Sequence, residues 1–302
     1  MVMRIATFAL SDQMVAGALR TQATMANLQV QESSGLKSET FAGYGSDTQH
    51  VVNLQVSVAR AQSHIDAATL ADSKVQVMYS AVGSMTDIIT QLRTQLSAAT
   101  TGGSTETSSA ISSAQQLLTQ MGSLLNTQYD GQYVFGGARV STAPVDLTSF
   151  ASGAGSTTTA DTSYYKGDGE IASVRVADDQ TVSYGVTADN SAFEQVMRTL
   201  KYVANSSSLS SSDITRALDL ASNALSATTA VQAKLSSAAS QIESASANQS
   251  DYKSFAETLS SDLSGVDVAA VTAQLSTYQT QLTASYSAIA KIQSLNLASY
   301  LK

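Results

Sequence analysis

Apolar residues recur at alternating steps of three and four positions over long parts of the chain, which is the spacing of amphipathic helices that pack along a seam. Between residues 51 and 99 no proline and a single glycine, Gly83, interrupt this pattern. The pattern predicts one continuous helix, about 70 Å long at 1.5 Å of rise per residue. Its seam is predicted at Val51, Leu54, Val58, Ala61, Ile65, Ala68, Asp72, Val75, Tyr79, Val82, Thr86, Ile89, Arg93 and Leu96.

The same spacing returns in the second half of the chain, where it predicts two more helices. Their seams are predicted at Ile214, Leu218, Ala221, Leu225, Thr228, Gln232, Leu235, Ala239 and Ile242, and at Val268, Val271, Leu275, Tyr278, Leu282, Ser285, Ile289 and Ile292. The N-terminal apolar residues are also spaced for a helix but form a broader stripe, made of Phe8, Leu10, Met14, Val15, Leu19, Met25 and Leu28. Both ends of the chain therefore carry apolar faces that a single pair of helices would cover only in part.

Short polar segments separate the predicted helices. "TTGGSTETSS" (100–109) is a turn, and the stripe after it predicts a helix through Leu125 that lies antiparallel to the long helix before it. Residues 190–205 predict another helix, with Asn190 or Ser191 as its N-cap and Phe193, Met197 and Leu200 on one face.

Residues 126–189 have a different pattern. "NTQYDGQYVFGGARVSTAPV" (126–145) combines Asp-Gly and Gly-Gly pairs with the only proline of the chain, and predicts turns around a short strand at 133–135. Alternating apolar residues on both sides of Asp178 and Asp179 predict a hairpin.

These elements predict a mainly α protein with a β-rich insert. We expect a long antiparallel helical coiled-coil rod, formed by the N- and C-terminal regions, around a smaller α+β middle domain. The predicted division is terminal assembly helices at 1–50 and 260–302, a helical rod domain at 51–128 and 206–259, and a β-rich outer domain at 129–205.

Net charge and the length of apolar runs exclude several classes of function. The 302 residues carry a net charge of -8 without a cluster of Lys or Arg, so the electrostatic footprint of a nucleic-acid binder is missing. No apolar run approaches the roughly 20 residues of a membrane span, and the N-terminal apolar patch is too short for a secretory signal. We therefore expect no nucleic-acid partner, no membrane insertion and, if the protein is exported, a route without a cleaved signal of the usual kind.

Candidate catalytic chemistry is sparse. The chain has no cysteine and only two histidines, His50 and His64, which a single helix would hold roughly 21 Å apart and so unable to share a metal. Asp178 and Asp179 could bind a cation, but turn chemistry explains them more simply. "GYGSDT" lacks the third glycine of a dinucleotide loop. We predict no enzyme activity, no metal and no cofactor.

The order of four stretches resembles the bacterial flagellin superfamily, and within it the hook-associated proteins of the hook–filament junction. The stretches are "MRIATFALSDQM" with "QVQESSGLKSETFAGYGSDTQHVVNL", "LLNTQYDGQYVFGGARVSTAPV", "YYKGDGEIASVRVADDQTVSYGVTADNSAFEQVMRTL" and "VDVAAVTAQLSTYQTQLTASYSAIAKIQSLNLASYL". The acidic pair and proline that relatives have after the SG bend are replaced here by Gly45-Ser46-Asp47-Thr48.

The resemblance implies a structural subunit of the extracellular bacterial flagellum, secreted through the flagellar type III export channel, that joins hook to filament by self-assembly. Implied partners are copies of the chain, the neighbouring hook-associated protein, filament flagellin and an export chaperone. The alternative is a filament flagellin, and two other classes stay open: a binding module or enzyme, and an exported coiled-coil adhesin or translocator. Subunit contacts are expected at Phe8, Met14, Leu19, Leu275, Tyr278, Leu282, Ile289 and Ile292.

Overall fold

The computed structural model describes residues 2–150 and 155–298, and it describes side chains for 11–148, 150 and 155–292. The chain divides into two compact units. One consists of residues 1–59 and 253–302, and the other of residues 60–252. Each unit is formed mainly by helices, as the sequence predicts.

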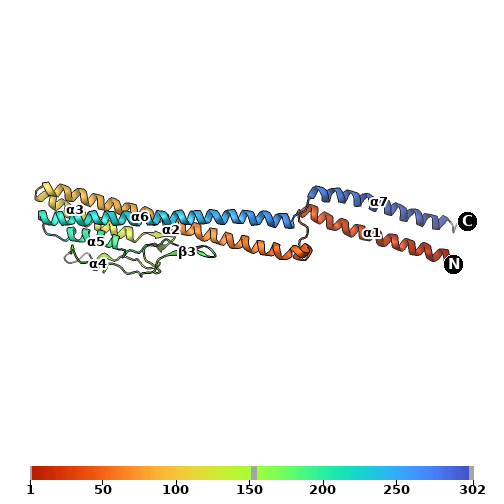
Figure 1. Ribbon diagram of the computed structural model, residues 1–302, viewed down its shortest axis with the longest axis horizontal. Coiled ribbons are helices and arrows are strands. Elements are labelled where there is room, and N and C mark those ends of the chain that lie inside the picture. Colours follow the sequence, from red (N-terminus) through yellow and green to blue (C-terminus); the bar gives the residue numbers. More distant parts are fainter. Residues whose placement is uncertain (1, 151–154, 299–302) are drawn as a thin grey trace. The chain divides into compact units, whose positions relative to one another are not determined.

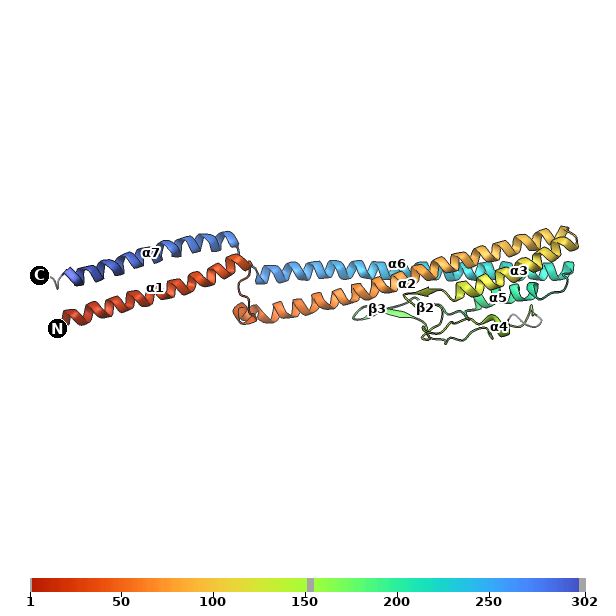
Figure 2. The same cartoon turned by 180° about the vertical axis from the view of Figure 1, so that it is seen from behind.

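Unit 60–252 contains most of the core. The larger parts of two long helices, α2 (Thr48–Thr101) and α6 (Ser211–Ser264), run side by side in it, and α3 (Ser104–Leu125) and α5 (Ser191–Ala204) pack along them (Figures 1 and 2). The turn at Gly102 and Gly103 reverses the chain between α2 and α3, which confirms their predicted antiparallel arrangement. Asn190 caps α5 by accepting a hydrogen bond from the amide of Ala192, as predicted.

The buried seams of α2 and α6 differ by one residue from seven of the 23 predicted seam positions. In α2 the positions predicted at Asp72, Tyr79, Thr86 and Arg93 are only half-buried or exposed, whereas Ala71, Met78, Met85 and Leu92 are buried. In α6, Ala217, Ala224 and Ala238 are likewise buried in place of Leu218, Leu225 and Ala239. The sequence pattern assumed a two-helix seam. Because α3, α5 and the middle region share this core, the buried face of each long helix is turned toward them.

The described part of the middle region, 126–150 and 155–189, contains two small antiparallel hairpins and one short helix. Strands β1 (Gln128–Tyr129) and β2 (Gln132–Tyr133) pair across the Asp130-Gly131 turn, while β3 (Ser173–Ala177) and β4 (Gln180–Ser183) pair across Asp178 and Asp179. Helix α4 spans Leu147–Phe150. The second hairpin confirms the prediction. The first differs from it, because β2 ends at Tyr133 and the segment that follows continues without a strand.

The segment that leaves α3 is anchored by polar and aromatic contacts. The Asn126 side chain accepts a hydrogen bond from the amide of Val145 and donates one to its carbonyl, both 2.9 Å long. Phe135 is fully buried, and its ring meets Phe193 of α5 edge-on, with ring centroids 5.8 Å apart. These contacts explain why the helical pattern stops here: the segment attaches the middle region to the helices.

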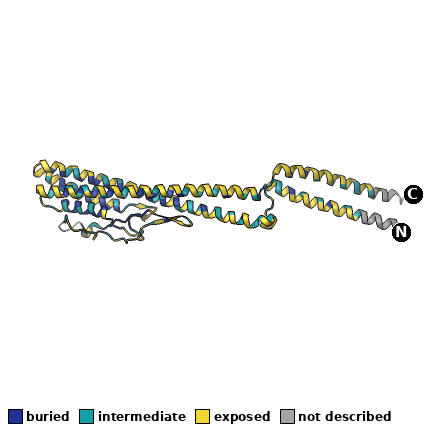
Figure 3. Cartoon of the chain, viewed as in Figure 1, coloured by how far each residue is buried: buried dark blue, intermediate teal, exposed yellow. Residues whose placement is uncertain are grey.

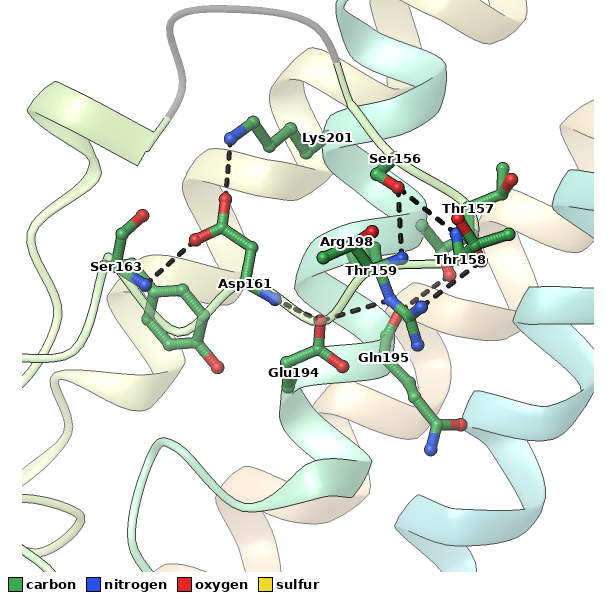
Figure 4. Close-up of polar contacts among 12 residues, drawn as sticks. Ser156, Thr157, Thr158, Thr159, Asp161, Ser163, Glu194, Gln195, Arg198 and Lys201 are labelled. Atoms are coloured by element: carbon green, nitrogen blue, oxygen red, sulfur yellow. Dashed lines mark hydrogen bonds and ion pairs between the residues drawn. The ribbon is translucent and has the colours of Figure 1, made fainter.

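An ion network fastens residues 155–163 to α5 (Figure 4). Glu194 is buried, accepts a hydrogen bond from the Asp161 amide and forms an ion pair with Arg198. Lys201 donates a hydrogen bond of 2.9 Å to the Asp161 carboxylate. Lys201 also lies 4.4 Å from the centre of the Phe150 ring. Burial raises the pKa of Asp161, but hydrogen bonds from Ser163 and Lys201 more than offset this and lower the pKa to about 2.

Unit 1–59/253–302 is built on α1 (Val2–Ser34) and α7 (Val268–Ala298), which lie side by side, with the 3₁₀ helix η1 (Phe41–Asp47) after α1. Gly35 follows α1 with φ of 69°, which is the bend predicted at Ser34-Gly35. Of the helices among residues 2–150 and 155–298, none is long and apolar enough to cross a membrane.

Candidate assembly surface

The α1–α7 pair is held by a thin core. Leu28 of α1 and Val271 and Leu275 of α7 form its buried cluster, with Val266 and Tyr278 packed against it. On α1, the buried and half-buried residues that face α7 are spaced as a single heptad seam, which is narrower than the stripe predicted from the sequence. The seam positions are Ser11, Met14, Ala18, Thr21, Met25 and Leu28, and three of them, Ser11, Ala18 and Thr21, are small or polar. The hydroxyl of Thr272 bonds to Glu32 across the pair, at 2.7 Å.

Backbone hydrogen bonds join the connection between α6 and α7 to the segment that follows α1. The amide of Lys37 donates to the Ser264 carbonyl at 2.8 Å, and the amide of Val266 donates to the Gly35 carbonyl at 3.0 Å. The Lys37 ammonium bonds to the Leu263 carbonyl. Two breaks in helical structure, far apart in sequence, are thus paired like a pair of short antiparallel strands. No local pattern predicts this contact, because backbone pairing leaves no mark in side-chain periodicity.

The residues predicted to form subunit contacts fall into two groups. Leu275 is buried within the α1–α7 pair, and Met14, Tyr278, Leu282, Ile289 and Ile292 are half-buried. Leu19 instead points outward and is 59% exposed. Phe8 lies in α1, but its side chain is outside the described residues.

Apolar side chains also cover parts of the outer surface of this unit. Figure 3 shows that exposed positions dominate the described parts of α1 and α7, whereas buried positions concentrate along the helices of unit 60–252. On α6, Phe255 is 64% exposed and Leu259, one helical turn further on, is also exposed. Among residues 11–59 and 253–292, whose side chains are described, the exposed large apolar residues are Val15, Leu19, Val30, Phe41, Val56, Phe255, Leu259, Val268 and Tyr286.

Polar chemistry offers no competing site in the described part of the chain. No group of three His, Cys, Asp or Glu residues there is placed to hold a metal ion. A groove of about 490 Å³ lies between α2 and α3, and Asp87 is the one charged residue among its lining residues. His50 is exposed, and His64 contacts Asp178 instead of a second histidine.

Two family models match the sequence. The bacterial flagellin N-terminal helical region matches residues 5–139, and the bacterial flagellin C-terminal helical region matches residues 218–301. The first covers α1, α2, α3 and the segment that leaves α3, and the second covers most of α6 and all of α7. No curated protein matches this chain in sequence.

Solved structures of flagellar proteins align with this chain at low sequence identity. A protein described as flagellar hook-associated, from Vibrio parahaemolyticus, aligns with a TM-score of 0.60 at 14% identity, over 72% of this chain and 97% of that one. FlgL of Bacillus cereus (TM-score 0.42, 13% identity) and hook associated protein-3 of Legionella pneumophila (0.45, 14%) each align over 72% of this chain, and over 98% and 97% of their own. Because flagellin models account for both helical ends and the architecture agrees, this chain belongs to the bacterial flagellin family.

Proposed function

We propose that this chain is a structural subunit of the bacterial flagellum that assembles through its terminal helices and joins hook to filament as a hook-associated protein. Family membership supports the flagellar role. The hook-associated role is supported by the protein from Vibrio parahaemolyticus, which is described as flagellar hook-associated and shares the fold.

The observation that carries the proposal is that α1 and α7 are long helices, whereas the buried core between their described side chains is small. Helices α1 and α7 have 33 and 31 residues, and their described side chains, at 11–34 and 268–292, form one buried cluster of three residues, while Leu19 and Tyr286 face outward. Ordering so much backbone costs more conformational entropy than so small a core offsets. The pair gains stability when neighbouring subunits cover its outer apolar residues, so folding of the ends is coupled to assembly.

The predicted contact residues then act in two ways. Leu19, with Val15 and Tyr286, contacts neighbouring subunits directly. Leu275 and the half-buried predicted residues hold α1 against α7 and thereby present the outer face. Copies of the chain, an adjacent hook-associated protein and filament flagellin are the proposed neighbours. An export chaperone would cover the same surface before secretion, and no catalytic role is proposed.

The substitution Leu19→Asp tests the surface. It places a charge on the outer face without entering the α1–α7 core, so we expect unchanged helix content but loss of assembly in a cell that lacks the natural chain. Gln13→Asp, at an exposed polar position on another face of the same helix, is the matched control and should assemble normally. Normal incorporation of the Leu19 variant would contradict the proposed surface.

Filament flagellin is the second candidate, since both matching family models describe helical regions of bacterial flagellin. A fluorescent tag on the chain separates the two. A hook-associated protein gives one band next to the hook and does not elongate on filament seeds, whereas a filament subunit labels the flagellum along its length. Labelling along the whole length would refute the junction role but leave the flagellar role intact.

A further inference from the structure

The methionines whose side chains are described fall into two groups that differ in burial. Met14 and Met25 lie in α1 and are half-buried, on the seam that faces α7. The methionines of unit 60–252 are at most 2% exposed; they are Met78, Met85, Met121 and Met197. The chain has no cysteine, so its only sulfur atoms are methionine thioethers. An oxidant that attacks sulfur therefore meets accessible targets in α1 and protected ones in unit 60–252.

The register of the α1–α7 pair places both half-buried methionines against α7. The two helices run in opposite directions (Figure 1), and the hydrogen bond that crosses the pair at Glu32 fixes their alignment. Counting along both helices from that bond, Met25 lies level with Tyr278 and Met14 lies level with Ile289. Tyr278 packs against the buried cluster of the pair, so Met25 borders this cluster.

Oxidation changes a methionine side chain from apolar to polar. Hydrogen peroxide transfers one oxygen atom to the thioether: an S–O bond forms, the O–O bond breaks, the sulfur gives up two electrons and water leaves. The sulfoxide oxygen accepts hydrogen bonds, so burying it in an apolar seam without a donor costs free energy. Among the described side chains, the buried cluster of the pair has three residues, which leaves little stability to offset this cost.

We propose that Met14 and Met25 are sites of reversible oxidation by peroxides. Sulfoxides at these positions loosen α1 from α7, and a methionine sulfoxide reductase restores the contact by removing the oxygen. Unit 60–252 stays folded, because its methionines are buried. A consequence for assembly rests on the proposed function, since a loosened pair no longer presents its outer face. The oxidation and the loosening themselves do not depend on that function.

Peptide mapping of the full chain after treatment with hydrogen peroxide tests the sites. The tryptic peptides 5–20 and 21–37 each carry one methionine, Met14 and Met25, so mass spectrometry resolves them. We expect sulfoxide to form there at least about tenfold faster than at the buried methionines of unit 60–252. Equal rates in the two groups would overturn the proposal.

Trypsin cleavage after Arg20 of the native full chain reports loosening of α1, in which this residue is exposed. We expect cleavage about three- to tenfold faster after peroxide treatment, and a return to the original rate after incubation with methionine sulfoxide reductases. The double variant Met14→Leu, Met25→Leu keeps an apolar seam and should show no acceleration. Acceleration of the same size in this variant would overturn the role of the two methionines.

The matched control is the double variant Met121→Leu, Met197→Leu, which removes two buried methionines and leaves α1 unchanged. Its cleavage after Arg20 should accelerate on oxidation as in the natural chain. If the control is protected instead, oxidation acts through unit 60–252 and the proposal is wrong.

Addition of the same chains to isolated flagellar hooks separates this inference from the proposed function. We expect peroxide treatment to reduce addition of the natural chain but not of the Met14→Leu, Met25→Leu variant. If treated and untreated natural chains add equally, the effect on assembly is refuted. If even the untreated chain does not add, the hook-associated role fails, and cleavage after Arg20 still decides whether the two methionines control the α1–α7 pair.

Discussion

Gly131 and Gly137 have the same backbone conformation but different surroundings. Both have φ of 71°, a region that residues with a side chain adopt only at a cost. A Cβ on Gly131 would meet nothing within 4 Å, whereas one on Gly137 would overlap the carboxylate and carbonyl oxygens of Asp168. That carboxylate accepts hydrogen bonds from the amides of Ala138 and Glu170.

Alanine substitutions at the two glycines separate backbone strain from the overlap. We expect Gly131→Ala to lower the free energy of unfolding by about 1–2 kcal/mol, the usual cost of a left-handed residue. Gly137→Ala should cost roughly 1–3 kcal/mol more, because the Asp168 carboxylate must leave its two amide donors. Urea unfolding of both variants measures the difference, and equal losses would show that the turn accommodates a side chain by moving freely.

The Lys201–Asp161 pair predicts an acid-sensitive contribution to stability. The pKa of Asp161 is lowered to about 2, below its unfolded value near 3.9. The contribution is therefore fully present above about pH 4 and is lost as the pH falls toward about 2. Lys201→Met keeps apolar contact with Phe150 but removes the charge, so the melting temperature should fall at neutral pH by the equivalent of about 1–3 kcal/mol, and less of the remaining stability should be lost in acid.

A second lysine provides the control for this measurement. Lys253 pairs with Glu257 at 3.5 Å on the surface of α6, where an ion pair contributes at most about 0.5 kcal/mol. Lys253→Met should leave both the melting temperature and its acid dependence nearly unchanged. If the two variants behave alike, the network that fastens residues 155–163 is not a stabilising contact.

Long helices were the most predictable elements, because the three-and-four spacing persists over many turns in α2, α6 and α7. The phase of the seam was less predictable. Ala68, Val75, Val82 and Ile89 fit two neighbouring heptad registers equally well, and the helices that share the core decide between them. In α7 the predicted seam agrees with the burial from Val271 onward, since there a single partner helix sets the buried face.

Neighbouring positions in α2 test the corrected register. Met85 is fully buried. Thr86, a predicted seam position, is half-buried, and its hydroxyl donates a hydrogen bond to the Val82 carbonyl of the same helix. We expect Met85→Ala to destabilise unit 60–252 by about 2–5 kcal/mol, as for other large-to-small core changes. Thr86→Ala should change the stability by less than about 0.5 kcal/mol. Similar losses from both substitutions would favour the register predicted from sequence.

The two units differ in the continuity of the chain segment that forms them and in the size of their buried cores. Unit 60–252 is one continuous segment with a large shared core, whereas the other unit combines both chain ends around a thin one. The assembly residues predicted from the resemblance lie in α1 and α7. Which of them face outward depends on how α1 and α7 pair. This pairing could not be predicted, because polar residues at several seam positions of α1 interrupt the apolar pattern that would mark the buried face.

This difference predicts that residues 60–252 fold without the chain ends. The segment keeps the buried cluster shared by α2, α3, α5 and α6, and it also keeps the contact of Arg60 and His64 with Asp178. We expect the fragment to unfold cooperatively, with the near-ultraviolet circular dichroism of packed aromatic residues, and to remain monomeric where the full chain assembles. A fragment of residues 71–241 is the control: it lacks Ala61, Ala68 and Ile242 from the buried seams, so it should melt at a lower temperature. A fragment 60–252 that binds hydrophobic dyes and melts without cooperativity would show that the terminal helices are needed to complete the core.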